Sequence, residues 1–232
     1  KRKSVSQFRE YDSAVNAFRL KYDAIPGDMD GNIAPKFGFS FDWGTSIGLR
    51  NGNGILEQRY QDTHSTPPTS SNILKSDEFV LFWNDLLRAG LLKSFSGNPL
   101  ISYVNWACNT AGGVTINSLD DCFPKTELNS KAHVFIVDIN SVNYYYVGHN
   151  ELFGNIVNSD KSYLLTPNQM KDLDNKIDDG SPSSGNLQNT YTAFTTVSLG
   201  SGLIGANACQ ASSTTYNNSK ISSCAMILKM AP

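Results

Sequence analysis

The sequence predicts an α+β fold in which a long N-terminal helix packs on an antiparallel β-sheet. Two observations lead to this expectation: an apolar stripe of helical spacing near the N-terminus, and β-type residues that are frequent in the second half of the chain. Two shorter helical patterns predict helical insertions. We expect the 232 residues to form a single domain, with the helix at 1–25, a loop and helical insertion at 26–130, and the sheet region at 131–232.

The first helix is indicated by apolar residues spaced alternately three and four positions apart. They are Phe8, Tyr11, Val15, Phe18 and Tyr22. This spacing places them on one face of a helix. Pro26 ends the helix, because proline has no amide hydrogen to donate. Nothing before Phe8 resembles a helix start, so the helix looks cut from a longer one.

A second helix is predicted from Ser76, a good capping residue, to about Gly90. Its apolar face comprises Phe79, Phe82, Trp83, Leu86 and Leu87. A third helix is predicted at 166–179, because Thr166 and Gln169 form a Thr-x-x-Gln capping box. Gly180 is a natural end for this third helix.

The sheet is predicted from runs rich in Val, Ile, Phe and Tyr. Residues 132–138 and 143–149 flank Asn140-Ser141, which predicts a hairpin. Further strand-like runs at 193–199 and 224–230 border a stretch rich in Gly, Ser, Thr and Asn at 200–223.

The cysteines form two local pairs, Cys108 with Cys122 and Cys209 with Cys224. Such pairs favour disulfides in an oxidising compartment, although four cysteines allow three connectivities. Four free thiols in a cytosolic protein remain the alternative.

The overall charge and the hydropathy exclude some function classes. With a net charge of −2 and scattered basic residues, no nucleic acid is expected as a partner. The sequence also shows no bilayer-spanning apolar run and no signal peptide. For an exported protein, we therefore expect a processed or truncated N-terminus.

Several short stretches occur in an order that is similar to the type IV pilin superfamily, which includes the pseudopilins of type II secretion. The stretches are 11–22 with 24–28, the Asn-Gly-Asn-Gly turn at 51–54, 78–83 with 86–91, and 174–180 followed by Gly185. The family's leader, cleavage site, apolar helical half and acidic residue near the mature terminus are absent. The resemblance implies that they were removed ahead of Lys1.

The resemblance also implies a role. It implies a pilin-like fold with a C-terminal disulfide loop, and a structural subunit, a minor pilin or pseudopilin, rather than an enzyme. Its partners would be other pilin or pseudopilin subunits, and the missing half of the first helix would anchor it in the inner membrane. Its location would be the periplasmic side of the bacterial inner membrane and then the pilus or pseudopilus. No cofactor is implied.

Two short motifs match patterns known from hydrolases and from dinucleotide-binding proteins, but the residues that follow each of them do not fit the structure that the pattern requires. Residues 44–48 match G-x-S-x-G around Ser46, but that motif requires a following helix, which the turn at 51–54 prevents. A serine hydrolase using Ser46 stays as an alternative function. Residues 200–205 match G-x-G-x-x-G, but no helix or acidic residue follows, so a loop is expected.

A second alternative is a secreted adhesin or carbohydrate-binding module. The aromatic residues that would form its sugar-binding platform are Tyr144, Tyr145, Tyr146, Trp43, Trp83 and Trp106. Such residues more commonly fill a core or a subunit interface, which we favour.

An acidic cluster crowds the end of the third helix, where the helix dipole disfavours negative charge. It comprises Asp172, Asp174, Asp178 and Asp179. Asp174, Asp178 and Asp179 are candidate calcium ligands, and some pseudopilins that this chain resembles bind calcium. On sequence alone we favour the alternative, a solvated helix end with Lys171 and Lys176 nearby.

Overall fold

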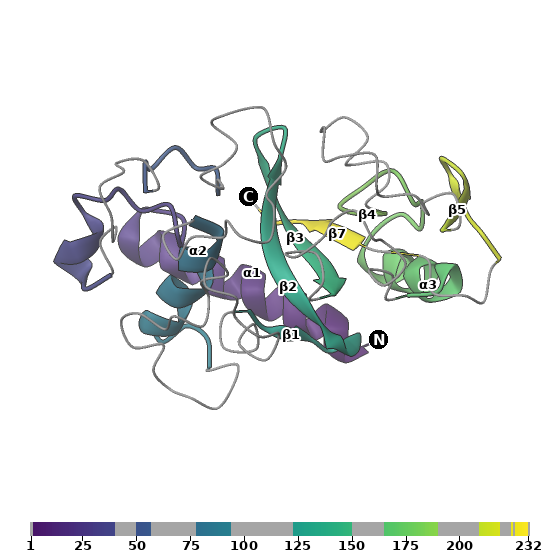
Figure 1. Cartoon of the computed structure of the whole chain (residues 1–232), viewed down its shortest axis with the longest axis horizontal. Helices are drawn as coiled ribbons and strands as arrows, with labels where there is room; N and C mark the ends of the chain where they lie inside the picture. The colour runs from purple at the N-terminus through teal and green to yellow at the C-terminus, as the bar shows by residue number, and fades with distance from the viewer. Residues whose placement is uncertain are drawn as a thin grey trace, which may run out of the picture. The chain divides into compact units, whose positions relative to one another are not determined.

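The computed structural model describes residues 2–39, 50–56, 78–93, 123–149, 165–189, 209–218, 224 and 226–231. Their helices are α1 (Arg2–Tyr22), the 3-10 helix η1 (Ala34–Phe37), α2 (Glu78–Arg88) and α3 (Pro167–Ile177) (Figure 1). Their strands are β1 (Lys125–Thr126), β2 (Asn129–Ile139), β3 (Val142–His149), β4 (Leu187–Asn189), β5 (Gln210–Ser212), β6 (Thr215–Tyr216) and β7 (Met226–Lys229). The protein is therefore of the α+β class, as the sequence predicts.

Five of the strands form a curled antiparallel sheet in the order β1-β2-β3-β7-β4 (Figure 1). The predicted β2–β3 hairpin is confirmed, with Ile139 paired to Val142 across the turn. Asn140 and Ser141 form this turn with φ angles of 52° and 63°. A turn with two positive φ angles matches the natural twist of paired strands, so it fixes the register of the hairpin. The strand predicted at 224–230 is β7.

Helix α1 runs for 21 residues, and its buried side chains confirm the predicted stripe. Phe8, Tyr11, Val15 and Phe18 are buried, whereas Tyr22 is half-buried. The opposite face is polar and exposed, apart from Leu20, which is 89% exposed. Among the described residues, no helix combines the length and the apolar character that crossing a bilayer requires.

The two shorter helices also match their predictions. Helix α2 buries Phe79, Phe82, Trp83 and Leu86 and is followed by Gly90 in the left-handed conformation (φ 70°). Helix α3 starts with the complete capping box: the Thr166 hydroxyl accepts from the Gln169 N–H at 3.3 Å, and the Gln169 side chain accepts from the Thr166 N–H at 2.9 Å. The capping box explains why α3 begins at Pro167, directly after Thr166.

The chain divides into two compact units. Unit 1 comprises Lys1–Phe8 and Lys125–Pro232, and unit 2 comprises Arg9–Pro124. In unit 1, the start of α1 contacts the sheet: the Phe8 and Tyr145 rings lie 5.8 Å apart between centroids. Gln7 also donates to the Lys125 carbonyl at 2.7 Å and accepts from the Glu127 N–H at 2.9 Å, which ties α1 to β1.

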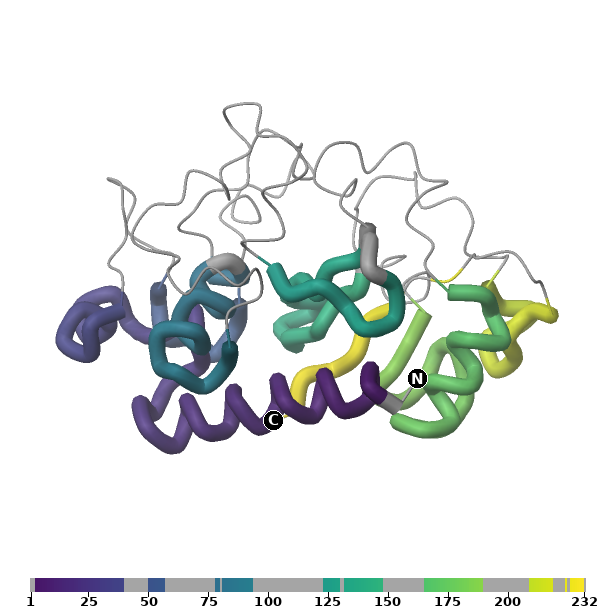
Figure 2. Tube along the Cα trace, turned by 90° about the horizontal axis from the view of Figure 1, so that it is seen from below, coloured from purple at the N-terminus to yellow at the C-terminus, as the bar shows by residue number. Residues whose placement is uncertain are grey.

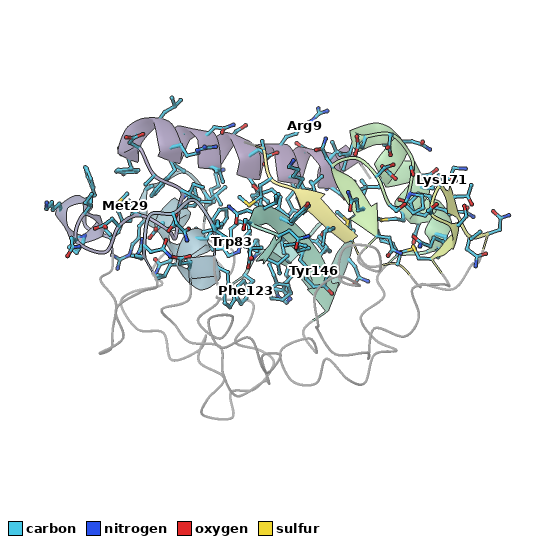
Figure 3. The ribbon with its side chains drawn as sticks, turned by 90° about the horizontal axis from the view of Figure 1, so that it is seen from above. Arg9, Met29, Trp83, Phe123, Tyr146 and Lys171 are labelled. Atoms are coloured by element: carbon cyan, nitrogen blue, oxygen red, sulfur yellow. A yellow bond between two sulfur atoms is a disulfide. The ribbon has the colours of Figure 1, made fainter. Side chains whose placement is uncertain are left out.

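Unit 2 is built around aromatic side chains. The Phe18 ring lies 4.5 Å from that of Tyr22 and 5.3 Å from that of Phe39, measured between centroids. Tyr11 packs edge-on against Trp83 at 4.9 Å, and Figure 3 labels Trp83 on α2. From Tyr11 onward, the apolar stripe of α1 therefore packs on α2 and on the loop that follows α1.

Several predicted features lie outside the described residues. They are the Ser76 cap of the second helix, the Ser46 motif, the Gly-rich motif at 200–205, the strand at 193–199, and the residues Trp43, Trp106, Cys108 and Cys122.

Candidate cation site

The candidate site lies in unit 1, where α3 ends and the chain turns toward β4. Asp174 is in the last turn of α3, Asp178 is the residue that caps it, and Asp179 follows. Asp174 lies four residues after Met170, so the two share the buried face of the helix. This position explains why a carboxyl group is fully buried (0% exposed) at the end of a polar helix.

The three carboxyl groups converge. One oxygen from each of Asp174, Asp178 and Asp179 can be chosen so that all three atoms lie within 4.8 Å of one another. Asp172, which the sequence placed in the same cluster, is not part of this group among the described residues. The convergence at 174, 178 and 179 matches the candidate ligands identified from the sequence.

Asp174 has one satisfied oxygen and one unsatisfied oxygen. Its Oδ2 accepts a hydrogen bond from the Tyr216 hydroxyl at 2.7 Å. Its Oδ1 is buried and has no hydrogen-bond partner among the described residues. Burying a carboxyl oxygen without a partner costs free energy, and a cation bound to that oxygen would offset the cost.

The other two carboxyl groups shape the loop that follows α3. Asp178 Oδ2 accepts from the N–H groups of Asn186 and Leu187. Asp179 accepts from the Ser181 N–H at 2.9 Å and from the Ser184 hydroxyl at 2.7 Å. Gly185 has a φ of +78°, and a Cβ atom there would overlap the Asp178 carboxylate. Glycine is therefore needed at position 185 for the loop to approach Asp178.

The electrostatics of the three carboxyl groups differ. Burial raises the pKa of Asp174 to about 6; the Tyr216 hydroxyl and the Gly180 backbone N–H oppose this shift, and the nearby Asp179 and Asp178 add to it. The pKa of exposed Asp179 is lowered by its hydrogen bonds from Ser184 and Ser181. A divalent cation would offset the mutual repulsion and the desolvation of Asp174, and oxygen ligands suit calcium.

The disulfide between Cys209 and Cys224 closes the loop that contains the β5–β6 hairpin, which lies beside this site. Their Cα atoms lie 5.0 Å apart, so this predicted pairing is confirmed. Cys224 exchanges two backbone hydrogen bonds with Leu165, at 3.0 and 3.3 Å, just ahead of α3. The β5–β6 hairpin within the disulfide loop lies next to α3 (Figure 2). It supplies Tyr216, the partner of Asp174.

Sequence reasoning missed Tyr216. It lies 42 residues from Asp174, in a polar stretch that gave no strand signal. Of the aromatic residues considered for a sugar platform, the structure describes Trp83, Tyr145 and Tyr146, which are buried, and Tyr144, which is half-buried. Trp83 and Tyr145 are both fully buried, so these two rings fill the core rather than face a ligand.

No protein-family model, curated protein or solved structure matches this chain.

Proposed function

We propose that this chain is a structural subunit, a minor pilin or pseudopilin, of a bacterial type IV pilus or type II secretion pseudopilus. The observation that supports this proposal best is the packing of the start of α1 on an antiparallel sheet. Phe8 contacts Tyr145 on β3, and Gln7 bonds to the backbone of Lys125 in β1 and of Glu127 directly after it. The disulfide loop close to the C-terminus is a second feature expected of that class.

In this proposal α1 has two faces with different tasks. Its apolar stripe holds the helix to the rest of the chain, and its polar face contacts neighbouring subunits. That polar face carries both signs of charge, Arg9 and Arg19 with Glu10, beside the exposed Leu20. A face of this kind suits contacts with other helices of mixed charge, because opposite charges set the register of such contacts. The subunit would act on the periplasmic side of the inner membrane, through assembly rather than catalysis.

Crosslinking in the bacterium of origin tests this assignment. A photo-crosslinking amino acid at exposed Asn16 or Leu20 should give adducts with pilin or pseudopilin subunits. The same probe at exposed Ser212, on the β5–β6 hairpin, is the comparison position. The proposal would be overturned if no position crosslinks to a pilin or pseudopilin subunit and the chain is also absent from sheared filaments. Esterase activity abolished by Ser46→Ala would favour the hydrolase alternative instead.

We also propose a calcium site at Asp174, Asp178 and Asp179. The observation that favours it is the buried, unpartnered Oδ1 of Asp174 beside two further carboxylates. Calcium there would hold the end of α3 to the loop before β4. A ligand at 100 times its dissociation constant stabilises the folded state by about 2.7 kcal/mol, so calcium should raise the midpoint of urea unfolding in unit 1.

Isothermal titration calorimetry with calcium chloride, against magnesium chloride, tests this site. The Asp179→Asn variant should lose the calcium heat, because it removes an exposed ligand without disturbing the core. Asp172→Asn is the matched control, since it makes the same change two residues before the group. Absence of calcium heat in the unaltered chain, or equal binding by both variants, would exclude the site.

A further inference from the structure

Unit 2 contains a second group of acidic side chains, which the cation site does not use. After α1, the chain turns at Gly27 and lies directly against α2; Met29, labelled in Figure 3, is in this loop. A Cβ atom at Gly27 would overlap the carbonyl oxygen of Glu78 and lie 2.8 Å from the Phe82 nitrogen. This close approach buries Asp28 (2% exposed) beside Glu78 (0% exposed).

Asp28 and Glu78 bind neighbouring N–H groups of one turn. Asp28 accepts from the Gly52 and Gly54 N–H groups, at 2.8 and 2.6 Å. Glu78 accepts from the N–H of Asn51, the preceding residue, at 3.4 Å. Because the consecutive N–H groups of Asn51 and Gly52 bind the two carboxyl groups, those groups lie beside each other.

A direct hydrogen bond between two carboxyl groups requires a proton. An ionised carboxylate only accepts hydrogen bonds, so one member of a bonded pair must be protonated. We propose that Asp28 and Glu78 share one proton at neutral pH, and that this shared proton locks the loop after α1 and the turn at 51–54 onto α2. The lock loosens when rising pH removes the proton.

The charged groups around the pair fit this assignment. The guanidinium of Arg50 is bonded to both oxygens of Asp85, at 2.7 and 2.9 Å, so the Arg50 charge is paired with Asp85 on the buried side of α2. Asp30 is half-buried and accepts from the Asn32 N–H, and Arg88 donates to the Gly38 carbonyl. The charged groups that the described part of unit 2 places on the elements around the pair are Asp23 and Asp30 on the loop after α1, Arg50 beside the turn, and Asp85 and Arg88 on α2.

The direction of the pH effect follows from linkage. Burial raises the pKa of Asp28 above its usual value, and the Gly54 and Gly52 N–H groups and the Glu78 side chain partly oppose the shift. The folded pair therefore keeps its proton at a pH where the unfolded chain, with carboxyl pKa values near 4, has released it. The stabilising effect is complete below pH ~4 and is lost as the pH rises through the folded pKa. For one proton, the unfolding constant of unit 2 increases by up to about tenfold per pH unit in that window.

Urea unfolding at several pH values, followed by tryptophan fluorescence, tests the lock. All three tryptophans, Trp43, Trp83 and Trp106, belong to unit 2, so their signal reports on that unit. Glu78→Gln should flatten the pH dependence, because an amide donates to Asp28 and accepts from Asn51 without titrating. Glu10→Gln, the same change at an exposed position of unit 2, should leave the dependence unchanged. Equal slopes for the unaltered chain and Glu78→Gln would overturn the proposal.

Infrared spectroscopy of the intact chain gives an answer even if Glu78→Gln fails to fold. The shared proton predicts a carboxylic-acid C=O stretching band at neutral pH, where Asp174, with a pKa of about 6, is mostly ionised. Asp174→Asn should leave this band in place, whereas a folded Glu78→Gln variant should lack it. A spectrum of the unaltered chain with no such band would exclude the shared proton.

Discussion

The two units satisfy their backbone hydrogen bonds by different means. In unit 1, most backbone groups of the sheet pair between strands. The capping box satisfies the start of α3, and a disulfide links Cys209 to Cys224. Unit 2 has no strand among its described residues, and its loops bond to buried side chains instead. Asp85 accepts from the Gly27 N–H at 2.8 Å, and Asp28 accepts from two glycine N–H groups. Because few side chains hold many loop amides in unit 2, single substitutions there should cost more than in unit 1.

The largest loss should come from Phe18→Ala in unit 2. Phe18 is fully buried between Tyr22 and Phe39, so its removal leaves a cavity and should cost about 3–5 kcal/mol. Arg19→Ala, one position along and exposed, should cost no more than about 0.5 kcal/mol. Urea unfolding followed by tryptophan fluorescence measures both. Equal losses would mean that the stripe of α1 does not hold unit 2 together.

Removing the disulfide should cost about 3 kcal/mol and should affect unit 1 alone. The Cys209–Cys224 bridge spans a sequence separation of 15. Closing a loop of that size reduces the entropy of the unfolded chain and stabilises the folded state by about 3 kcal/mol. The variant replaces both cysteines with alanine, which suits their full burial. Hydrogen exchange at the amides of β2 and β3 should report the loss, while tryptophan fluorescence stays unchanged. If the stability that tryptophan fluorescence reports for unit 2 fell by a similar amount, the two units would not unfold separately.

Gly27→Ala should cost about 2 kcal/mol more than Gly54→Ala. Both glycines have a φ of +86°, so the backbone strain of alanine is the same at each. At Gly54 a Cβ meets nothing within 4 Å, whereas at Gly27 it meets the backbone of α2. The difference in stability between the two variants therefore measures the cost of the steric clash between the alanine Cβ at position 27 and the backbone of α2. Equal unfolding midpoints in urea would show that α2 moves aside easily.

The smallest effect should be that of Thr166→Ala, about 1 kcal/mol, in unit 1. The substitution removes the hydroxyl that accepts from the Gln169 N–H at the start of α3. Asn168→Ala, an exposed change in the same turn, should stay within about 0.5 kcal/mol. Hydrogen exchange of the α3 amides measures the loss of stability in each of the two variants. An unchanged α3 in Thr166→Ala would mean that Tyr216 and the disulfide loop, rather than the cap, hold the helix.

The features predictable from sequence are those that a short window determines. The α1 stripe, the α3 capping box, the turn at Asn140-Ser141 and the Cys209–Cys224 pair each depend on residues close along the chain. The sheet order was not predictable, because β7 inserts between β3 and β4 from far along the sequence.

The side-chain partners were equally hidden. Arg50 meets Asp85 across 35 residues, and Tyr216 meets Asp174 across 42. Periodicity contains no information about such pairs, since they form only after the elements have packed. In the candidate cation site, the sequence could therefore nominate the carboxylates but not the hydroxyl that orients one of them.

The disulfide also determines how this protein responds to proteolysis. The chain between Cys209 and Cys224 includes the exposed tip of the β5–β6 hairpin, a type of site that proteases cut readily. A cut there would separate the fragment that contains β7 from everything before it. The bridge would nevertheless keep β7 covalently attached beside β3, so the cleaved chain would migrate as one band until it is reduced. In a protease-rich compartment, a backbone break in this loop would therefore not remove an inner strand from the sheet.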